Sequence, residues 1–294
     1  MVAEVSGTDA HDRMTFALGG DLLVNRLGYG NRQLTGPGIW GEPADRPGAL
    51  RLLRRAVELG VEFIDTADAY GPGVAEALTA EALYPYPGNL VIGTKAGMVR
   101  TGPGEWHPLG RPEYLRQQCE MSLRHLRVER IDLYQLHRID PLVAMEDQIG
   151  VLSELQKEGK IRHIGLSEVT IDEIAGAQKV IAVVSVQNRF NLKDRGADPV
   201  IDFCERVNIA FIPWFPLAKG EFGGSSGVLG QVARRVGATP AQVALAWLLA
   251  RSPVLIPIPG TASIPHLEEN LGARAVALGR QDLSELDRIG HVAK

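Results

Sequence analysis

The chain lacks the features that mark secreted and membrane proteins. Its 294 residues include two cysteines, Cys119 and Cys204, which are too few for a disulfide framework. No apolar run approaches the roughly 18 residues of a membrane span, and residues 1–13 contain no apolar signal-peptide core. We therefore expect a cytoplasmic protein in which residues 1–13 form a flexible tail and residues 14–294 form one domain.

Neither sign of charge is in large excess. Lys and Arg number 31 and Asp and Glu number 35, which gives a net charge of −4 and no electrostatic basis for binding nucleic acid or an anionic membrane. The seven histidines show no metal-ligand spacing, so we expect no metal site. With 45% hydrophobic residues, the chain can bury a large core. We expect a monomer or small homo-oligomer that acts on a small molecule.

Short runs of apolar, β-branched residues recur along the chain and predict buried strands. The runs are nearly continuous rather than alternating, as in parallel strands that are covered on both faces. From residue 28 to residue 257 there are seven units of about 33 residues, a length typical of βα repeats. The predicted strands are residues 24–30, 61–65, 90–95, 131–137, 161–167, 183–187, 209–214 and 254–259.

Amphipathic segments between these runs predict helices, for example over residues 49–59. Asp140-Pro141 and Thr239-Pro240 each combine an N-cap residue with a first-turn proline, which predicts two helix starts. Eight strand–helix units favour an α/β fold of the (β/α)8 TIM barrel type, and a doubly wound open sheet is the alternative. Residues 14–24 predict a β-hairpin, turned at Gly19-Gly20, that caps the barrel floor.

Polar side chains stand at the ends of most of the predicted strands. In a barrel, the carboxyl ends of the strands hold the active site. Each residue also has an ordinary explanation, because Asp65 and Lys95 could form a structural ion pair and His137 could be a core histidine. Their convergence on one mouth favours an active site. The residues are Asp65, Lys95, His137, Ser167, Gln187 and Trp214.

Three of these residues make chemical sense together with Tyr70, which lies five residues beyond Asp65. An ammonium ion beside a phenol stabilises the phenolate and makes the phenol a better proton donor, which suits Lys95 and Tyr70. The carboxylate of Asp65 would hold the lysine, and the imidazole of His137 would orient a substrate oxygen. This set can protonate a carbonyl oxygen while a nicotinamide delivers hydride to the carbon.

Several motifs in the same order resemble the aldo-keto reductase family from about residue 24 to residue 290. They are DTADAYG (65–71), TK (94–95), LH (136–137), IGLS (164–167), VQ (186–187) and IPIPGTASIPHLEEN (256–270). The resemblance implies a (β/α)8 barrel that binds NADP(H) without a Rossmann fold. It also implies that Tyr70 is the general acid, that Lys95 and Asp65 tune it, and that His137 orients the carbonyl.

The resemblance further implies a set of cofactor contacts. Ser167 and Gln187 would bind the nicotinamide carboxamide, and Trp214 would stack on the ring. Glu168, which stands where the family commonly has Asn, is a further expected cofactor contact, and Trp214 replaces the commoner tyrosine. The remaining contacts implied for the pyrophosphate and the adenosine end are Leu217, Lys219, Gly220, Gly260, Thr261, His266, Glu269 and Asn270.

The choice between NADPH and NADH depends on the charge at the 2′-phosphate. Gly260 and His266 stand roughly where the family often has Lys and Arg. Lys219 could supply the missing charge, so NADPH is favoured over NADH.

The segment GPGIWG (36–41) matches the G-x-G-x-x-G pattern but has neither the preceding strand nor the following helix of a dinucleotide fold. We interpret it as a loop at the barrel mouth. Tyr29, Trp40 and Trp106 are candidate substrate-pocket residues, although both tryptophans could instead be loop anchors.

Other segments point to one branch of the family. NRLGYG (25–30) and EALYPYP (81–87) resemble the branch with bacterial pyridoxal reductases, or pyridoxine 4-dehydrogenases, which makes pyridoxal a candidate substrate. The alternatives are a sugar or secondary-metabolite ketone, or a nicotinamide-binding regulatory subunit with slow turnover.

Overall fold

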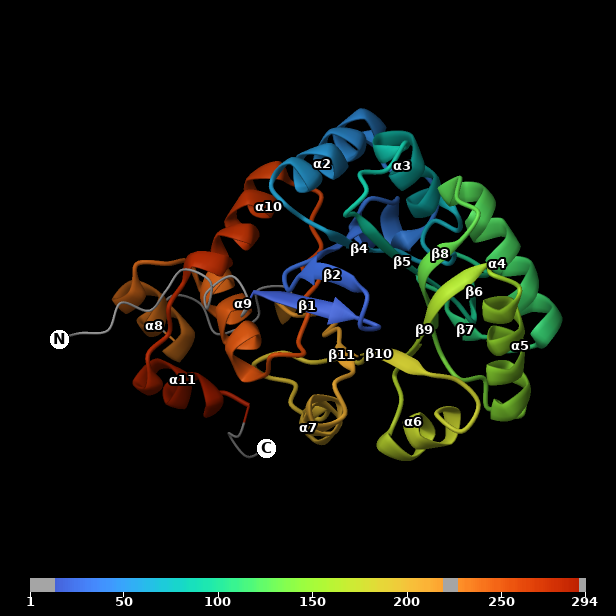
Figure 1. Ribbon diagram of the computed structural model, residues 1–294. Coiled ribbons are helices and arrows are strands. Elements are labelled where there is room, and N and C mark those ends of the chain that lie inside the picture. Colours follow the sequence, from blue (N-terminus) through green and yellow to red (C-terminus); the bar gives the residue numbers. More distant parts are fainter. Residues whose placement is uncertain (1–13, 219–226, 291–294) are drawn as a thin grey trace.

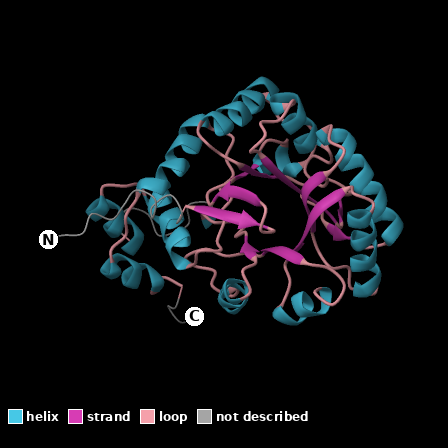
Figure 2. Ribbon diagram, viewed as in Figure 1, coloured by secondary structure: helices cyan, strands magenta, loops and turns pink. Residues whose placement is uncertain are grey.

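In the computed structural model, which describes residues 14–218 and 227–290, a curled parallel sheet lies inside a ring of helices (Figures 1 and 2). Seven strands are hydrogen-bonded in the order β11-β10-β9-β8-β5-β4-β3, and every neighbouring pair is parallel. The (β/α)8 barrel predicted from the sequence is confirmed. The strands are β3 (Tyr29–Gly30), β4 (Phe63–Asp65), β5 (Val91–Ala96), β8 (Ile131–Leu136), β9 (Ile161–Ser167), β10 (Val183–Gln187) and β11 (Ala210–Phe211).

The eighth predicted strand, residues 254–259, closes the barrel without forming a full ladder. It makes an isolated bridge between Phe211 and Leu255 on one side, and the amide of Gly28 donates to the Pro257 carbonyl on the other. Pro257 and Pro259 have no N–H to donate, so regular pairing stops at these positions.

The predicted N-terminal hairpin is present as β1 (Thr15–Leu18) and β2 (Leu22–Asn25), which pair in antiparallel register. Asp21 at its turn contacts Arg162 and His163, at 2.6 Å each, near the start of β9. The hairpin therefore lies across the amino ends of the strands, which form the barrel floor. The prediction of one strand over 24–30 was wrong at its start, because Val24 and Asn25 pair within the hairpin.

The helices bury their apolar faces against the outside of the sheet. Helix α2 begins one turn before the predicted residue 49 because Asp45 caps it through the amide of Gly48. The α-helices are α2 (Arg46–Glu58), α3 (Val74–Leu83), α4 (Pro112–Leu126), α5 (Met145–Lys157), α6 (Ile171–Ala177), α7 (Asp198–Arg206), α8 (Val228–Val236), α9 (Pro240–Arg251), α10 (Ile264–Leu271) and α11 (Arg280–Asp287). Of the helices in the described ranges, none combines the length and apolar character needed to cross a membrane.

Two predicted helix starts had different outcomes. Thr239 caps α9 with a complete capping box and Pro240 is its first residue, as predicted. Asp140 does not cap a helix, because its carboxylate accepts the amides of Gly110 and Leu142 in a turn, and α5 begins only at Met145. The Asp-Pro pair therefore begins a turn. Through Gly110, this turn holds the loop that joins the paired strands β6 (Met98–Val99) and β7 (His107–Pro108) to α4.

Candidate active site

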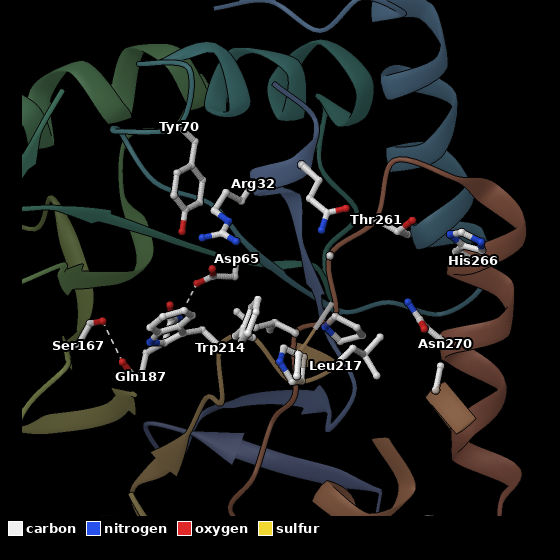
Figure 3. Close-up of a pocket in the computed structure, with 18 of the residues that line it drawn as sticks. Arg32, Asp65, Tyr70, Ser167, Gln187, Trp214, Leu217, Thr261, His266 and Asn270 are labelled. Atoms are coloured by element: carbon white, nitrogen blue, oxygen red, sulfur yellow. Dashed lines mark hydrogen bonds between the residues drawn. The ribbon is translucent and has the colours of Figure 1, made fainter. Parts of the chain in front are cut away.

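An elongated cavity of about 760 Å³ opens where the carboxyl ends of the strands meet (Figure 3). Side chains from the ends of β4, β8, β9 and β10 line one end of it, and residues of α10 and of the segment before it line the other. Its lining includes Asp65, Tyr70, Trp106, His137, Ser167, Gln187, Trp214, Leu217, Gly260, Thr261, His266, Glu269 and Asn270.

Lys95 stands at the centre of the end of the cavity that Asp65, Tyr70 and His137 line. Its ammonium donates to Asp65 Oδ2 at 2.6 Å and to the Thr66 carbonyl at 2.7 Å, and it lies 3.5 Å from the Tyr70 hydroxyl. Burial by itself lowers the pKa of Lys95, but the charge of Asp65 and the contact with Tyr70 outweigh it and raise the pKa of this ammonium. An ammonium that is charged at physiological pH thus faces the phenol oxygen.

Asp65 joins several strands through its second carboxylate oxygen. Oδ1 accepts from the side-chain amides of Gln135 at 3.2 Å and Gln187 at 2.9 Å, while Oδ2 faces Lys95. The carboxylate is 2% exposed, so these donors replace water around its charge. One buried residue therefore aligns groups from β4, β5, β8 and β10.

His137 lies beside the phenol, with ring centroids 6.0 Å apart in an edge-on arrangement. Its pKa is held well below the usual value by burial, first, and then by the positive charges of Lys95, Arg138, Arg32 and Arg100. The imidazole is therefore neutral at physiological pH. Its Nδ1 is buried and has no hydrogen-bond partner among the described residues, which leaves the ring available to a ligand oxygen.

Trp106 forms the third side of this aromatic cluster. Its ring lies edge-on to both Tyr70 and His137, at 6.3 Å and 6.2 Å, and it lines the cavity. The guanidinium of Arg100 stacks on its other face at 3.6 Å. Arg100 also donates to five backbone carbonyls, those of Gly38, Ile39, Ala69, Gly102 and Glu105. The arginine thereby fastens the 36–41 loop and the 100–106 loop to the Tyr70 segment.

Two residues that the sequence places in the substrate pocket do not line the cavity. Tyr29 is fully buried, and its hydroxyl donates to the Thr261 carbonyl at 2.7 Å, so it is a core residue that supports the barrel closure. Trp40 is half-buried in a bridge with Gly71 and packs near Arg100, which makes it the loop anchor of the alternative interpretation.

The residues that the resemblance assigns to nicotinamide, Ser167, Gln187 and Trp214, line the cavity. Leu217, which the resemblance assigns to the pyrophosphate, lines it as well. Ser167 Oγ already donates to the Gln187 carbonyl at 2.8 Å and accepts from Arg138 Nη1 at 3.0 Å. The amide nitrogen of Gln187 is bound to Asp65, so its side-chain oxygen is the atom left for a carboxamide N–H.

Glu168 has a different place from the one expected. It is exposed, is not part of the cavity lining, and accepts from Trp214 Nε1 at 2.6 Å and from the Arg189 amide at 2.7 Å. The carboxylate holds the edge of the indole rather than facing the cavity.

The far end of the cavity lies along α10 and the segment that precedes it. Gly260, Thr261, His266, Glu269 and Asn270 line it, and Ser263 caps the helix through the His266 amide. A side chain at Gly260 would approach the Gly30 carbonyl to 2.8 Å, so glycine is required there by the strand packing. Lys219 and Gly220 lie outside the described residues.

Two arginines that line the cavity were missed by the sequence analysis. Arg138 directly follows His137 at the end of β8, and Arg32 lies two residues beyond β3. Both stand at strand ends, so the rule that identified Asp65 and His137 could also have identified them.

The barrel, the phenol–ammonium–carboxylate group and the adjacent neutral imidazole together define an oxidoreductase that acts on a carbonyl group. The model of the Aldo/keto reductase family matches residues 26–291. The chain belongs to this family, as the sequence motifs predict.

Individual relatives extend over nearly the whole chain. An uncharacterized oxidoreductase of Schizosaccharomyces pombe is 50% identical over 98% of this chain and 94% of its own length. Pyridoxine 4-dehydrogenase of Escherichia coli is 44% identical over 94% of this chain and 98% of its own length. The crystal structure of an aldo-keto reductase from Klebsiella pneumoniae in complex with NADPH is 27% identical, with a TM-score of 0.78 over 93% of this chain and 94% of that one.

Proposed function

We propose that the protein reduces an aldehyde or ketone to an alcohol, with NADPH as reductant and Tyr70 as proton donor. The observation that carries this proposal is the position of the Tyr70 hydroxyl, 3.5 Å from a buried ammonium that is itself bound to Asp65. Such a phenol is poised to release a proton in a site largely closed to water.

Each residue around the carbonyl group has a separate role in its reduction. Neutral His137 donates a hydrogen bond that orients the substrate oxygen without adding a second positive charge. Tyr70 transfers its proton to that oxygen as negative charge develops on it. Lys95 stabilises the resulting phenolate, and Asp65 keeps the ammonium in place. Trp106 covers the reacting groups on the loop side and excludes water.

The cavity suits an extended dinucleotide. Bound NADPH supplies the hydride that the carbonyl carbon takes up. The free oxygen of Gln187 would accept from the carboxamide, and the indole of Trp214 would stack on the ring. At the other end the first turn of α10 offers backbone amides that suit phosphate binding, beside His266 and Asn270.

Pyridoxal, reduced to pyridoxine, is the substrate that we propose to test first. The relative from Escherichia coli is named pyridoxine 4-dehydrogenase, and its 44% identity extends over nearly the whole chain. The aromatic cluster of Tyr70, Trp106 and His137 would pack against a planar ring. Sugar and secondary-metabolite ketones belong in the same panel.

The decisive variant is Tyr70→Phe. Removing the hydroxyl should lower kcat by about 100-fold or more with every substrate, while the Kd for NADPH stays within about twofold of the wild-type value. A variant with full activity would refute the assignment of the proton donor.

A panel of carbonyl compounds tests the activity itself. NADPH consumption with pyridoxal or another carbonyl substrate is the expected result. Tight NADPH binding without turnover of any aldehyde or ketone would instead support a regulatory nicotinamide-binding subunit.

A further inference from the structure

Arg32 is held at the cavity by a rigid piece of backbone. It lies in the short 3-10 helix η1 (Asn31–Gln33), directly after β3. The preceding Asn31 is fully buried and donates to the Ala75 carbonyl and to Thr79 Oγ1 on α3. The hydroxyl of Thr35 donates to the Arg32 carbonyl. The position of the Arg32 Cα is therefore fixed from both sides.

The guanidinium of Arg32 differs from the other cations around the site. It lines the cavity, and within residues 14–218 and 227–290 it makes no hydrogen bond and no ion pair. Figure 3 shows it in the region of Tyr70 and Asp65. Lys95 is occupied by Asp65, and Arg138 is bound to the His137 carbonyl and to Ser167. Arg32 thus retains five N–H donors for a ligand.

The end of the cavity that Asp65, Tyr70 and His137 line also carries an excess of positive charge. The charges of Lys95, Arg138 and Arg32 all act on His137, and the nearby carboxylate of Asp65 compensates only the lysine. Glu168 is turned outward onto Trp214, and its charge acts on Arg138. A half-buried, uncompensated guanidinium favours an anionic ligand, because the planar fork matches the oxygens of a carboxylate or phosphate.

We propose that Arg32 is a specificity residue that binds an anionic oxygen group carried by the carbonyl substrate close to its reacting carbon. The inference rests on the proposed function and deepens it: the preferred substrates are aldehydes or ketones with a carboxylate, a phosphate or an ionised phenol. The neutral substrate of the same shape is reduced by the same catalytic groups but is bound less well.

The test compares two aldehydes that differ in charge and little in shape, 3-carboxybenzaldehyde and methyl 3-formylbenzoate. Arg32→Met keeps much of the length of the side chain and removes its charge, and Arg32→Lys keeps the charge but loses the planar fork. Arg51→Met, on the exposed face of α2 (Arg46–Glu58), removes one positive charge away from the cavity and is the matched control.

With the wild-type protein and with Arg51→Met, we expect the acid to have a kcat/KM at least about 10-fold above that of the ester. Arg32→Met should abolish this preference by lowering kcat/KM for the acid, and it should leave the ester within about twofold. Arg32→Lys should recover part of the preference. Equal losses for acid and ester in Arg32→Met would overturn the proposal.

The phosphates of NADPH are the other anions that Arg32 could bind. Measuring the affinity for NADPH distinguishes this role from binding of the substrate anion. In Arg32→Met the Kd for NADPH should be unchanged, whereas an increase of 10-fold or more would assign the guanidinium to the cofactor and overturn the proposal.

A readout without turnover keeps this result apart from the proposed activity. Calorimetric titration of the NADPH-loaded protein, in which an alcohol has no hydride acceptor, with 3-(hydroxymethyl)benzoate and with its methyl ester should show tighter binding of the acid, lost in Arg32→Met. If the acid binds no better than the ester, the inference fails even where both aldehydes are reduced. If the acid is preferred and neither aldehyde is reduced, the proposed function fails and the anion site stands.

Discussion

The indole nitrogen of Trp214 donates a hydrogen bond to Oε1 of Glu168, and the two atoms are 2.6 Å apart. This bond fixes the ring that we expect to stack on nicotinamide. Glu168→Ala should therefore raise the Kd for NADPH by about 3- to 10-fold, because the indole loses its orientation. Glu168→Gln retains an acceptor oxygen and should stay close to the wild type. Titration by tryptophan fluorescence measures both.

The chain contains a matched control for this variant. Trp247 Nε1 donates to Asp287 at 2.9 Å on the outside of the barrel, away from the cavity lining. Asp287→Ala removes a comparable indole acceptor and should leave the Kd for NADPH unchanged. If Asp287→Ala weakened NADPH binding as much as Glu168→Ala does, both effects would come from a general loss of stability.

Lys95→Met should lower both the free energy of unfolding and kcat. It leaves the Asp65 carboxylate buried without its cation, which costs about 3–5 kcal/mol of unfolding free energy. It also removes the charge that stabilises the phenolate, so kcat should fall by about 100-fold or more. Denaturant unfolding and steady-state kinetics measure the two effects.

The double variant Asp65→Asn with Lys95→Met separates these effects. Removing both charges should restore most of the stability, since Gln135 and Gln187 can still donate to the asparagine oxygen. The rate should not recover. Recovery of kcat in the neutral pair would show that the ammonium has no chemical role.

The buried imidazole of His137 predicts a pH dependence of stability. Its pKa in the folded state is depressed by burial and by neighbouring cations, so below about pH 6.5 the unfolded chain takes up a proton that the folded chain does not. Stability should fall as the pH is lowered from 6.5, by up to about 1.4 kcal/mol per unit from this group. His137→Gln should show a shallower slope between pH 5 and 6.5 in denaturant titrations.

His125 is the internal comparison, because its shift has the opposite sign. Its hydrogen bond to buried Glu76, at 3.1 Å, raises the pKa of His125 despite partial burial. Its contribution to stability is present at low pH and is lost as the pH rises through the raised pKa. His125→Gln should therefore change the slope above pH 6.5 rather than below it.

Arg100→Lys should loosen the substrate side of the site. Lysine keeps the charge but cannot reach the five carbonyls that the guanidinium binds, nor stack in the same way on Trp106. We expect KM for the carbonyl substrate to rise by about 10-fold, with a smaller change in kcat. Arg54→Lys, whose side chain binds one carbonyl on the outer surface, should leave KM unaltered.

The sequence was sufficient for the barrel and for the grouping of Asp65, Tyr70, Lys95 and His137, because each lies at or just beyond the end of a strand. It was insufficient where the backbone departs from regular pairing. The prolines of residues 254–259 reduce a predicted strand to a bridge, and Tyr29 faces the core, where its hydroxyl donates to the Thr261 carbonyl. Side-chain partners such as Glu168 and Trp214 depend on tertiary contacts that no spacing encodes.

Asp65 accepts hydrogen bonds from side chains on three other strands, so the groups that support the reacting phenol belong to the barrel wall and not to the loops above it. The loops that carry Arg32 and Trp106 are built on top of that wall. Exchanging these loops between two such barrels would transfer the substrate preference. Tyr70, Lys95 and Asp65, which deliver the proton, would be left unchanged.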